Sequence, residues 1–234
     1  MELFKSLENK TKSFSEPFDH FEINEPLTES AIKEISAADV LDPKKENLNY
    51  DGTRALDGGD GAFRSGIKDG GKAKKLRCYV TKENSNQFPH LTNFIEELRS
   101  EKVYKKIGSL IGKDLSNSYV RLEVICDREG FWLKPHCDIK EKLMSSIIFI
   151  NLHDESENLG TDFYDKNLTK VKTVPYKHNY GYFFTSGPES WHGMEKKEIK
   201  KERRCIQVNY VTFPTDWKVT VSYTHLTLPT TPYV

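Results

Sequence analysis

The chain lacks an excess of charge of either sign and has no long apolar run. Its 234 residues contain 35 Lys and Arg against 35 Asp and Glu, so the formal net charge is zero. No overall field therefore favours nucleic acid or a membrane surface. No segment approaches the roughly 18 apolar residues of a transmembrane helix, and the N-terminus has no apolar signal-peptide core. We expect neither nucleic acid nor a membrane as a partner.

Cysteine is also scarce, and its spacing excludes a disulfide scaffold. The four cysteines are Cys78, Cys126, Cys137 and Cys205, and no two of them form a C-x-x-C pair. Isolated thiols are typical of a reducing compartment, so we expect a cytoplasmic protein. The sequence contains no glycine loop for phosphate and no internal repeat. The common nucleotide-binding and repeat architectures are therefore not indicated.

Two stretches in the first half have the apolar period of helices. Residues 27–41 begin near Thr28, a good helix cap, and carry Ile32 and Ile35 on one face. Residues 88–111 are the strongest helical stretch. Their apolar positions are Phe94, Leu98, Ile107 and Ile111. We expect one helix in each stretch, with the second supporting a sheet and taking no part in chemistry.

From residue 119 onward the apolar period becomes that of strands. Tyr119, Arg121 and Glu123 alternate with Val120, Leu122 and Val124, which predicts a half-buried strand. Residues 143–152 form a continuous apolar run, and 180–185 and 205–213 are two further strand candidates. Glycines at 130, 160, 181 and 187 mark turns between them. The pattern predicts a mainly β protein with flanking helices, arranged as a sandwich or jelly roll.

Three residues have the pattern of an iron site. His136 and Asp138 are two positions apart, so on a strand both side chains point to the same face. His192, in a turn bounded by Pro188 and Gly193, supplies a third ligand from far along the chain. Two histidines and one carboxylate form the facial triad of non-heme Fe(II) oxygenases, whose remaining positions stay open for a cosubstrate and O2.

Together these motifs resemble the 2-oxoglutarate- and Fe(II)-dependent dioxygenases with a cupin-like double-stranded β-helix core. The resemblance is strongest to prolyl-hydroxylase-like and phytanoyl-hydroxylase-like bacterial and phage members. It covers most of the chain. The segments that carry it are Pro17–Ile23, Tyr119–Asp138, Gly160–Tyr164, Asn179–Phe184 and Arg203–Tyr210.

The resemblance implies an activity and its cofactors. Fe(II) would be held by His136, Asp138 and His192, and 2-oxoglutarate would chelate the metal and pair with an arginine. O2 reduction would be coupled to decarboxylation of 2-oxoglutarate to succinate and CO2, with hydroxylation of a small-molecule or peptidyl substrate. The sequence departs from the family at Arg203–Cys205, where many relatives have Arg-x-Ser. A thiol, which is a weak donor, replaces that hydroxyl.

The arginine that would bind 2-oxoglutarate is either Arg203 or Arg204, because the two lie on opposite faces of one strand. Arg203 shares its face with Cys205, Gln207 and Asn209, whereas Arg204 shares its face with Ile206, Val208 and Tyr210. We predict that Arg203 points into the barrel and that Arg204 reaches solvent. Tyr119 and Arg121 are further candidates for holding 2-oxoglutarate or substrate. A purely structural role suits both of them equally well.

Two other functions fit the same residues. A cupin-like metal-binding protein that does not use 2-oxoglutarate, such as an isomerase or a sensor, would not need the late arginine. A catalytically inactive barrel that serves as an interaction module would not need the triad. If these residues bind no metal, His136 and Asp138 would form a structural pair, and His192 would cap a turn.

The expected organisation is a single oxygenase domain over residues 17–218, with its core at 119–213. Residues 1–16 are polar and should be flexible. The glycine-rich segment 42–75 is either an active-site lid or disordered. Residues 219–234 resemble a translated sequencing-adapter read-through, so we expect a non-native tail.

The tail expectation has a direct test. Deleting residues 220–234 should leave the free energy of unfolding and metal binding unchanged, because a non-native segment has no evolved packing. Chemical denaturation would measure this. A loss of more than roughly 2 kcal/mol, the scale of one buried large apolar side chain, would show that the segment is integrated.

Overall fold

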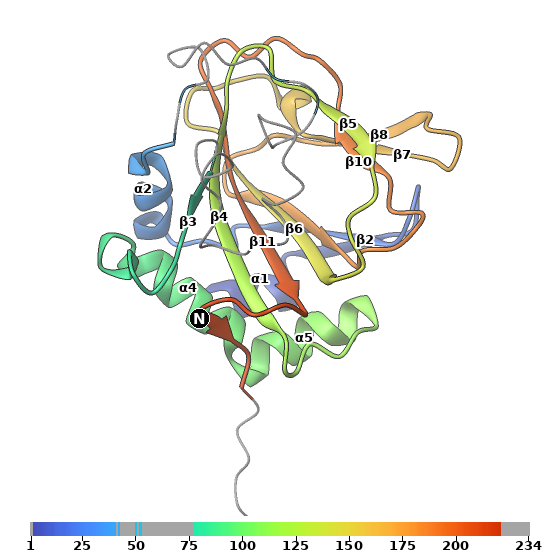
Figure 1. Ribbon diagram of the computed structural model, residues 1–234. Coiled ribbons are helices and arrows are strands. Elements are labelled where there is room, and N and C mark those ends of the chain that lie inside the picture. Colours follow the sequence, from blue (N-terminus) through green and yellow to red (C-terminus); the bar gives the residue numbers. More distant parts are fainter. Residues whose placement is uncertain (1, 41, 43–49, 51, 53–76, 221–234) are drawn as a thin grey trace, which may run out of the picture.

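The structure is a computed structural model that describes residues 2–40, 42, 50, 52 and 77–220 (Figure 1). Most of segment 42–75 and residues 221–234 lie outside this description, and so do the expectations for them. Within the described residues no helix is both long and apolar enough to cross a membrane.

Two antiparallel sheets form the body of the protein. The larger sheet has eight strands in the order β1-β2-β9-β6-β11-β4-β12, with β3 also paired to β4. These strands are β1 Thr11–Phe14, β2 His20–Asn24, β3 Arg77–Tyr79, β4 Tyr119–Asp127, β6 Lys142–Ile150, β9 Tyr180–Phe184, β11 Arg203–Val211 and β12 Trp217–Lys218. The smaller sheet has the order β5-β10-β7-β8. Its strands are β5 Leu133–His136, β7 Thr161–Tyr164, β8 Lys170–Val174 and β10 His192–Met194.

Four α-helices accompany the sheets in the described residues: α1 Glu2–Asn9, α2 Glu29–Ala37, α4 Pro89–Arg99 and α5 Glu101–Ile111. Two short 3-10 turns, η3 Ser85–Gln87 and η4 Glu157–Leu159, complete the elements. The expected mainly β architecture with flanking helices is confirmed. Thr28 caps α2 as predicted, because its Oγ1 accepts a hydrogen bond from the Ala31 amide at 3.3 Å.

The two faces of the large sheet pack against different partners. On one face Val124, Ile206 and Val208 join the apolar residues of the helices in a single cluster. On the other face Phe149 and Cys205 pack with residues of the small sheet. This division follows from the alternation of side chains along a strand. The expectation of a half-buried β4 is wrong, because the helices cover one face and the small sheet lies over the other.

The single helix expected over residues 88–111 is divided into α4 and α5. Ser100 has an extended conformation (φ −67°, ψ 140°), and its hydroxyl donates to the Glu97 carbonyl at 2.6 Å. A serine side chain that bonds to nearby backbone in this way competes with helix continuation. All four apolar positions of the predicted face are nevertheless buried, namely Phe94, Leu98, Ile107 and Ile111.

The N-terminal segment is ordered, contrary to expectation. Leu3, Phe4 and Leu7 are buried on one face of α1, and β1 pairs with β2 along its whole length. Three apolar side chains on one face suffice to anchor so short a helix to a larger core. At the other end, Val219 is fully buried and its amide donates to the Ser118 carbonyl at 2.8 Å. The predicted tail boundary at residue 219 is therefore too early.

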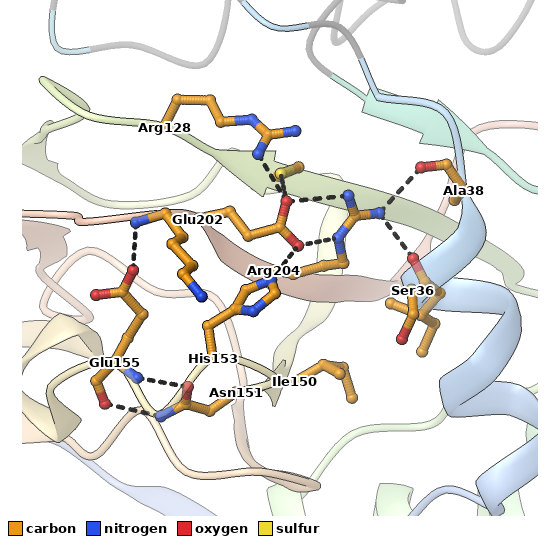
Figure 2. Close-up of polar contacts among 12 residues, drawn as sticks. Ser36, Ala38, Arg128, Ile150, Asn151, His153, Glu155, Glu202 and Arg204 are labelled. Atoms are coloured by element: carbon orange, nitrogen blue, oxygen red, sulfur yellow. Dashed lines mark hydrogen bonds and ion pairs between the residues drawn. The ribbon is translucent and has the colours of Figure 1, made fainter.

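Arg204 does not reach solvent, and this prediction is wrong. Its Nη1 donates to the Ile35 carbonyl at 2.8 Å and the Ala38 carbonyl at 2.9 Å, at the end of α2. Its Nε donates to Glu202 at 2.8 Å, and Glu202 also accepts from Arg128 at 2.7 Å (Figure 2). An arginine suits this place because the last carbonyls of a helix have no partner within the helix and carry partial negative charge.

Glu202 is the centre of this group of contacts. Besides the two arginines it accepts from the Cys126 thiol at 3.3 Å, and His153 Nε2 lies 3.7 Å away. Burial alone would raise the pKa of Glu202, but hydrogen bonds and charges, chiefly from Arg204, lower it to about 2. The ionised carboxylate thus ties the end of α2 to the ends of β4 and β6.

Replacing Arg204 should lower the free energy of unfolding of the protein. Arg204→Met leaves the Ala38 carbonyl and one arm of Glu202 without the arginine donor, and the Ile35 carbonyl keeps only the Ala38 amide at 3.4 Å, which together should cost about 2–4 kcal/mol. Urea unfolding would measure the change. Lys200→Met, at an exposed position nearby, is the matched control and should stay within about 0.5 kcal/mol. Equal values for both variants would contradict the capping role.

Candidate metal centre

The three predicted metal ligands meet at one edge of the small sheet. His136 is the last residue of β5 and His192 the first of β10, and the two are direct partners in the antiparallel register. Their ring centroids are 4.4 Å apart. Asp138 joins them, and the ligand atoms of all three residues lie within 4.8 Å of one another. Asp138 does not lie on the same strand as His136, contrary to the prediction, because β5 ends at His136 and Asp138 belongs to the following loop.

Backbone carbonyls orient both imidazoles. His136 Nδ1 donates to the Lys134 carbonyl at 2.8 Å, and His192 Nδ1 donates to the Ser190 carbonyl at 2.9 Å. A carbonyl can only accept, so the hydrogen is on Nδ1 and the lone pair on Nε2 is available for a metal. In each case the acceptor lies two residues before the histidine, a relation that the sequence pattern did not indicate.

The electrostatics of the triad suit a divalent cation. Burial and the neighbouring His136 lower the pKa of His192 to about 4, so this imidazole is neutral near pH 7. Burial alone would raise the pKa of Asp138, but Lys142 and the two histidines hold it well below its usual range. Two imidazoles and one ionised carboxylate are a donor set that fits Fe(II).

Two side chains of the large sheet hold the Asp138 carboxylate in place. Its Oδ1 accepts from Lys142 Nζ at 2.5 Å, and its Oδ2 accepts from the Ser145 hydroxyl. Both partners belong to β6, whereas the two histidines come from the small sheet. The ligand set therefore depends on the packing of one sheet on the other.

The triad opens into a cavity of about 420 Å³ between the sheets. Its wall combines cations, polar groups and apolar side chains. The charged and polar side chains that line it include Arg77, Lys142, Thr161, Tyr182, Arg203 and Gln207. The apolar part includes Leu133, Ile147, Phe184 and Met194. A cavity that joins a metal-ligand set to a buried arginine can hold a chelating anion that reaches both.

Arg203 lines this cavity, as the sequence predicted for the inward arginine. Its side chain is almost completely buried, and its Nη1 donates to Asp127 Oδ2 at 2.6 Å. Its Nε donates to the Leu159 carbonyl at 2.5 Å, and its Nη2 lies 3.5 Å from Thr161 Oγ1. The Tyr182 hydroxyl also donates to Thr161 Oγ1, at 3.0 Å. One guanidinium and two hydroxyls therefore converge on one end of the cavity.

The remaining candidates lie elsewhere. Arg204, Tyr119 and Arg121 are absent from the cavity wall. Tyr119 begins β4 at the distal end of the sheet, opposite Val211. Arg121 is buried behind the wall and donates to Asn209 at 2.8 Å. The sequence did not predict that Thr161, Tyr182 and Lys142 belong to the site. Thr161 and Tyr182 did fall in segments that resembled the dioxygenases, but Lys142 carried no such signal.

Comparisons with known proteins support the fold described above. No protein-family model matches the chain, and no curated protein matches its sequence. A prolyl-4-hydroxylase from Pseudomonas putida superposes with a TM-score of 0.53 at 11% identity, over 91% of this chain and 98% of that one. A prolyl hydroxylase from Trichoplax adhaerens, in complex with a hypoxia inducible factor peptide fragment, superposes with a TM-score of 0.48 at 13% sequence identity. The superposition covers 90% of this chain and 88% of that one. The first likeness confirms, for the fold alone, the resemblance to 2-oxoglutarate- and Fe(II)-dependent dioxygenases.

Removing the carboxylate of the triad should remove the metal site. Asp138→Asn keeps the shape of the side chain but takes away the charge, so Fe(II) affinity should fall by at least about 100-fold (roughly 2.7 kcal/mol). Anaerobic equilibrium titration with Fe(II) or Co(II) would measure it. Asp19→Asn, at an exposed position, is the control and should bind as the unmodified protein does. Undiminished affinity in the Asp138 variant would remove the triad hypothesis.

Proposed function

We propose that the protein is a 2-oxoglutarate- and Fe(II)-dependent dioxygenase with a jelly-roll, double-stranded β-helix core, acting as a hydroxylase. One observation carries the proposal: His136, Asp138 and His192 line the same cavity as the buried guanidinium of Arg203. Bound Fe(II) and 2-oxoglutarate would supply the activation of O2, coupled to formation of succinate and CO2. The P. putida hydroxylase fold is consistent with this chemistry.

The chain's own part is to bind and orient. The two Nε2 atoms and the Asp138 carboxylate would hold Fe(II) on one side and leave the cavity side open. The distal carboxylate of 2-oxoglutarate would bind at the other end, where Arg203 supplies charge-assisted hydrogen bonds. The Thr161 hydroxyl, 3.5 Å from Nη2, supplies there the hydroxyl that Cys205 lacks, since the Cys205 Sγ lies 3.9 Å from Nη1.

Asp127 occupies part of this arginine site. It already pairs with Nη1 of Arg203, so an incoming carboxylate would compete with it or bind through Nη2. The same ion pair favours a second candidate function. If Asp127 fully satisfies Arg203, the protein is a cupin-like metal-binding protein without 2-oxoglutarate, such as an isomerase or a sensor. Anaerobic Fe(II) titration with and without 2-oxoglutarate separates the two, because only chelation by the 2-oxo acid produces a weak visible charge-transfer band.

Opposite substitutions at this ion pair should have opposite effects on 2-oxoglutarate binding. Arg203→Ala should raise the dissociation constant by about two to three orders of magnitude, because losing one partner of a buried charge pair costs about 3–5 kcal/mol and about 1.4 kcal/mol is tenfold. Arg203→Lys should recover only part of the lost affinity for 2-oxoglutarate, since a point charge cannot replace the forked contact of the guanidinium. Asp127→Asn should lower the constant by releasing Nη1.

Titration calorimetry on the Fe(II)-loaded, oxygen-free protein gives all these constants. Arg204→Lys serves as the control, because Arg204 faces the helices and should leave the constant unchanged. If the Arg203 and Asp127 variants both bind 2-oxoglutarate as the unmodified protein does, the cupin-like alternative is the better explanation.

A further inference from the structure

Gln207 is a polar residue of the cavity wall whose acceptor is not used within the fold. Its side chain is 8% exposed and lines the cavity. Its Oε1 is buried, and no group in the described part of the chain donates a hydrogen bond to it. A buried amide oxygen without a donor costs free energy, which a ligand N–H or O–H can recover. An unmet acceptor in a cavity wall therefore indicates a contact with a bound molecule.

The neighbouring polar residues on the same face of β11 are satisfied by the protein itself. Asn209 accepts from Arg121 Nη2 at 2.8 Å, and its Nδ2 donates to Ser145 Oγ at 3.0 Å. Each guanidinium nitrogen of Arg203 has an acceptor. The fold thus supplies partners on either side of Gln207 along the strand. The unmet acceptor belongs to this one position and is not a general feature of the inward face.

Neither the cross-strand neighbours of Gln207 nor the proposed cosubstrate can supply the donor. On β6 its neighbour is the apolar Ile147, and on β4 its neighbour is Glu123, whose carboxylate pairs with Arg77 at 2.9 Å. Ionised 2-oxoglutarate has two carboxylates and a keto group, so it carries acceptors and no N–H or O–H. The donor must therefore come from another molecule in the cavity.

The place of Gln207 on the strand puts that molecule beside the metal ligands. At the next inward position of β11, Asn209 donates to Ser145 Oγ, and the Ser145 hydroxyl donates to Asp138 Oδ2. Gln207 thus lies between the strand position of Arg203 and the residues that hold the carboxylate ligand. A group that binds Oε1 is therefore close to the proposed iron site, where a substrate C–H bond has to be positioned.

We propose that Gln207 determines substrate specificity by accepting a hydrogen bond from an N–H or O–H group of the substrate. The substrate class is a molecule with such a donor near the C–H bond that is oxidised, as in a lactam, a secondary amide or an alcohol. A prolyl ring in a peptide has neither an N–H nor an O–H and could not fill this role. The inference deepens the proposed function and rests on it for the reaction, although not for the hydrogen bond.

Matched pairs of probes with and without the donor test this specificity. We would measure dissociation constants of pyrrolidinone and N-methylpyrrolidinone, N-methylacetamide and N,N-dimethylacetamide, and cyclohexanol and its methyl ether. The protein would be oxygen-free and loaded with Fe(II) and 2-oxoglutarate. The donor member of at least one pair should bind about tenfold more tightly, because its partner leaves the buried acceptor unmet. Equal constants in every pair, or no measurable binding of any donor member, would overturn the proposal.

Two variants of Gln207 separate the hydrogen bond from the bulk of the added methyl group. Gln207→Met removes the acceptor at similar size, so the ratio of the two constants should fall to about one. Gln207→Glu keeps an acceptor oxygen, so the preference for the donor member should be retained. The readout is a ratio within one protein, so a general loss of affinity cancels. A preference that persists in Gln207→Met, or that is lost in Gln207→Glu, would contradict the proposal.

The stability of the ligand-free protein distinguishes a binding role of Gln207 from a structural one. Gln207→Met removes an acceptor that has no donor in the described fold, so the urea midpoint should stay the same or rise. Asn209→Met is the comparison on the same strand face, and its midpoint should fall because bonds to Arg121 and Ser145 are lost. A fall of equal size in the Gln207 variant would show that this residue serves the fold, and would refute the specificity role.

The same probe titrations on metal-free protein distinguish this proposal from the dioxygenase proposal. Gln207 Oε1 lacks a donor there as well, so the donor member should still be preferred. A missing chelate band together with a retained donor preference would refute the dioxygenase proposal alone. A normal chelate band without any donor preference would refute only the substrate class.

Discussion

The pairing of β11 with β4 on one side and β6 on the other is the constraint on which the rest of the structure depends. This central strand is buried on both faces, so each alternate residue must satisfy a different environment. Arg203 points into the cavity and Arg204 into the helical layer, where it caps α2. A shift of the register by one residue would exchange the two arginines and destroy both the cavity end and the cap.

The metal centre depends on a second set of strand pairs. Register between β5 and β10 places His136 opposite His192, and the packing of the two sheets brings Asp138 to Lys142 and Ser145 of β6. Each ligand thus has a partner that orients it before any metal arrives. Such preparation suits a site that must hold its ligands in one geometry.

Buried charge links these two parts. Asp127, Glu123 and Asp138 each pair with a cation of the cavity wall. The sequence contains every one of these residues, but its composition shows nothing of their pairing. Alternation along a strand identified the inward face of β11. It could not show which carboxylates from β4 would lie beside that face, because this depends on pairing between distant segments.

Local pattern determined much of this protein by itself: the mainly β class, the Thr28 cap, the strand positions, and the histidines and aspartate that meet as a possible metal site. These features follow from side-chain period and from residue chemistry over short distances. Tertiary structure alone decided the break at Ser100, the ordered α1, the burial of Arg204 and the presence of Lys142 in the cavity. The reason is physical, because burial and the partner of each polar group are fixed only when remote elements pack together.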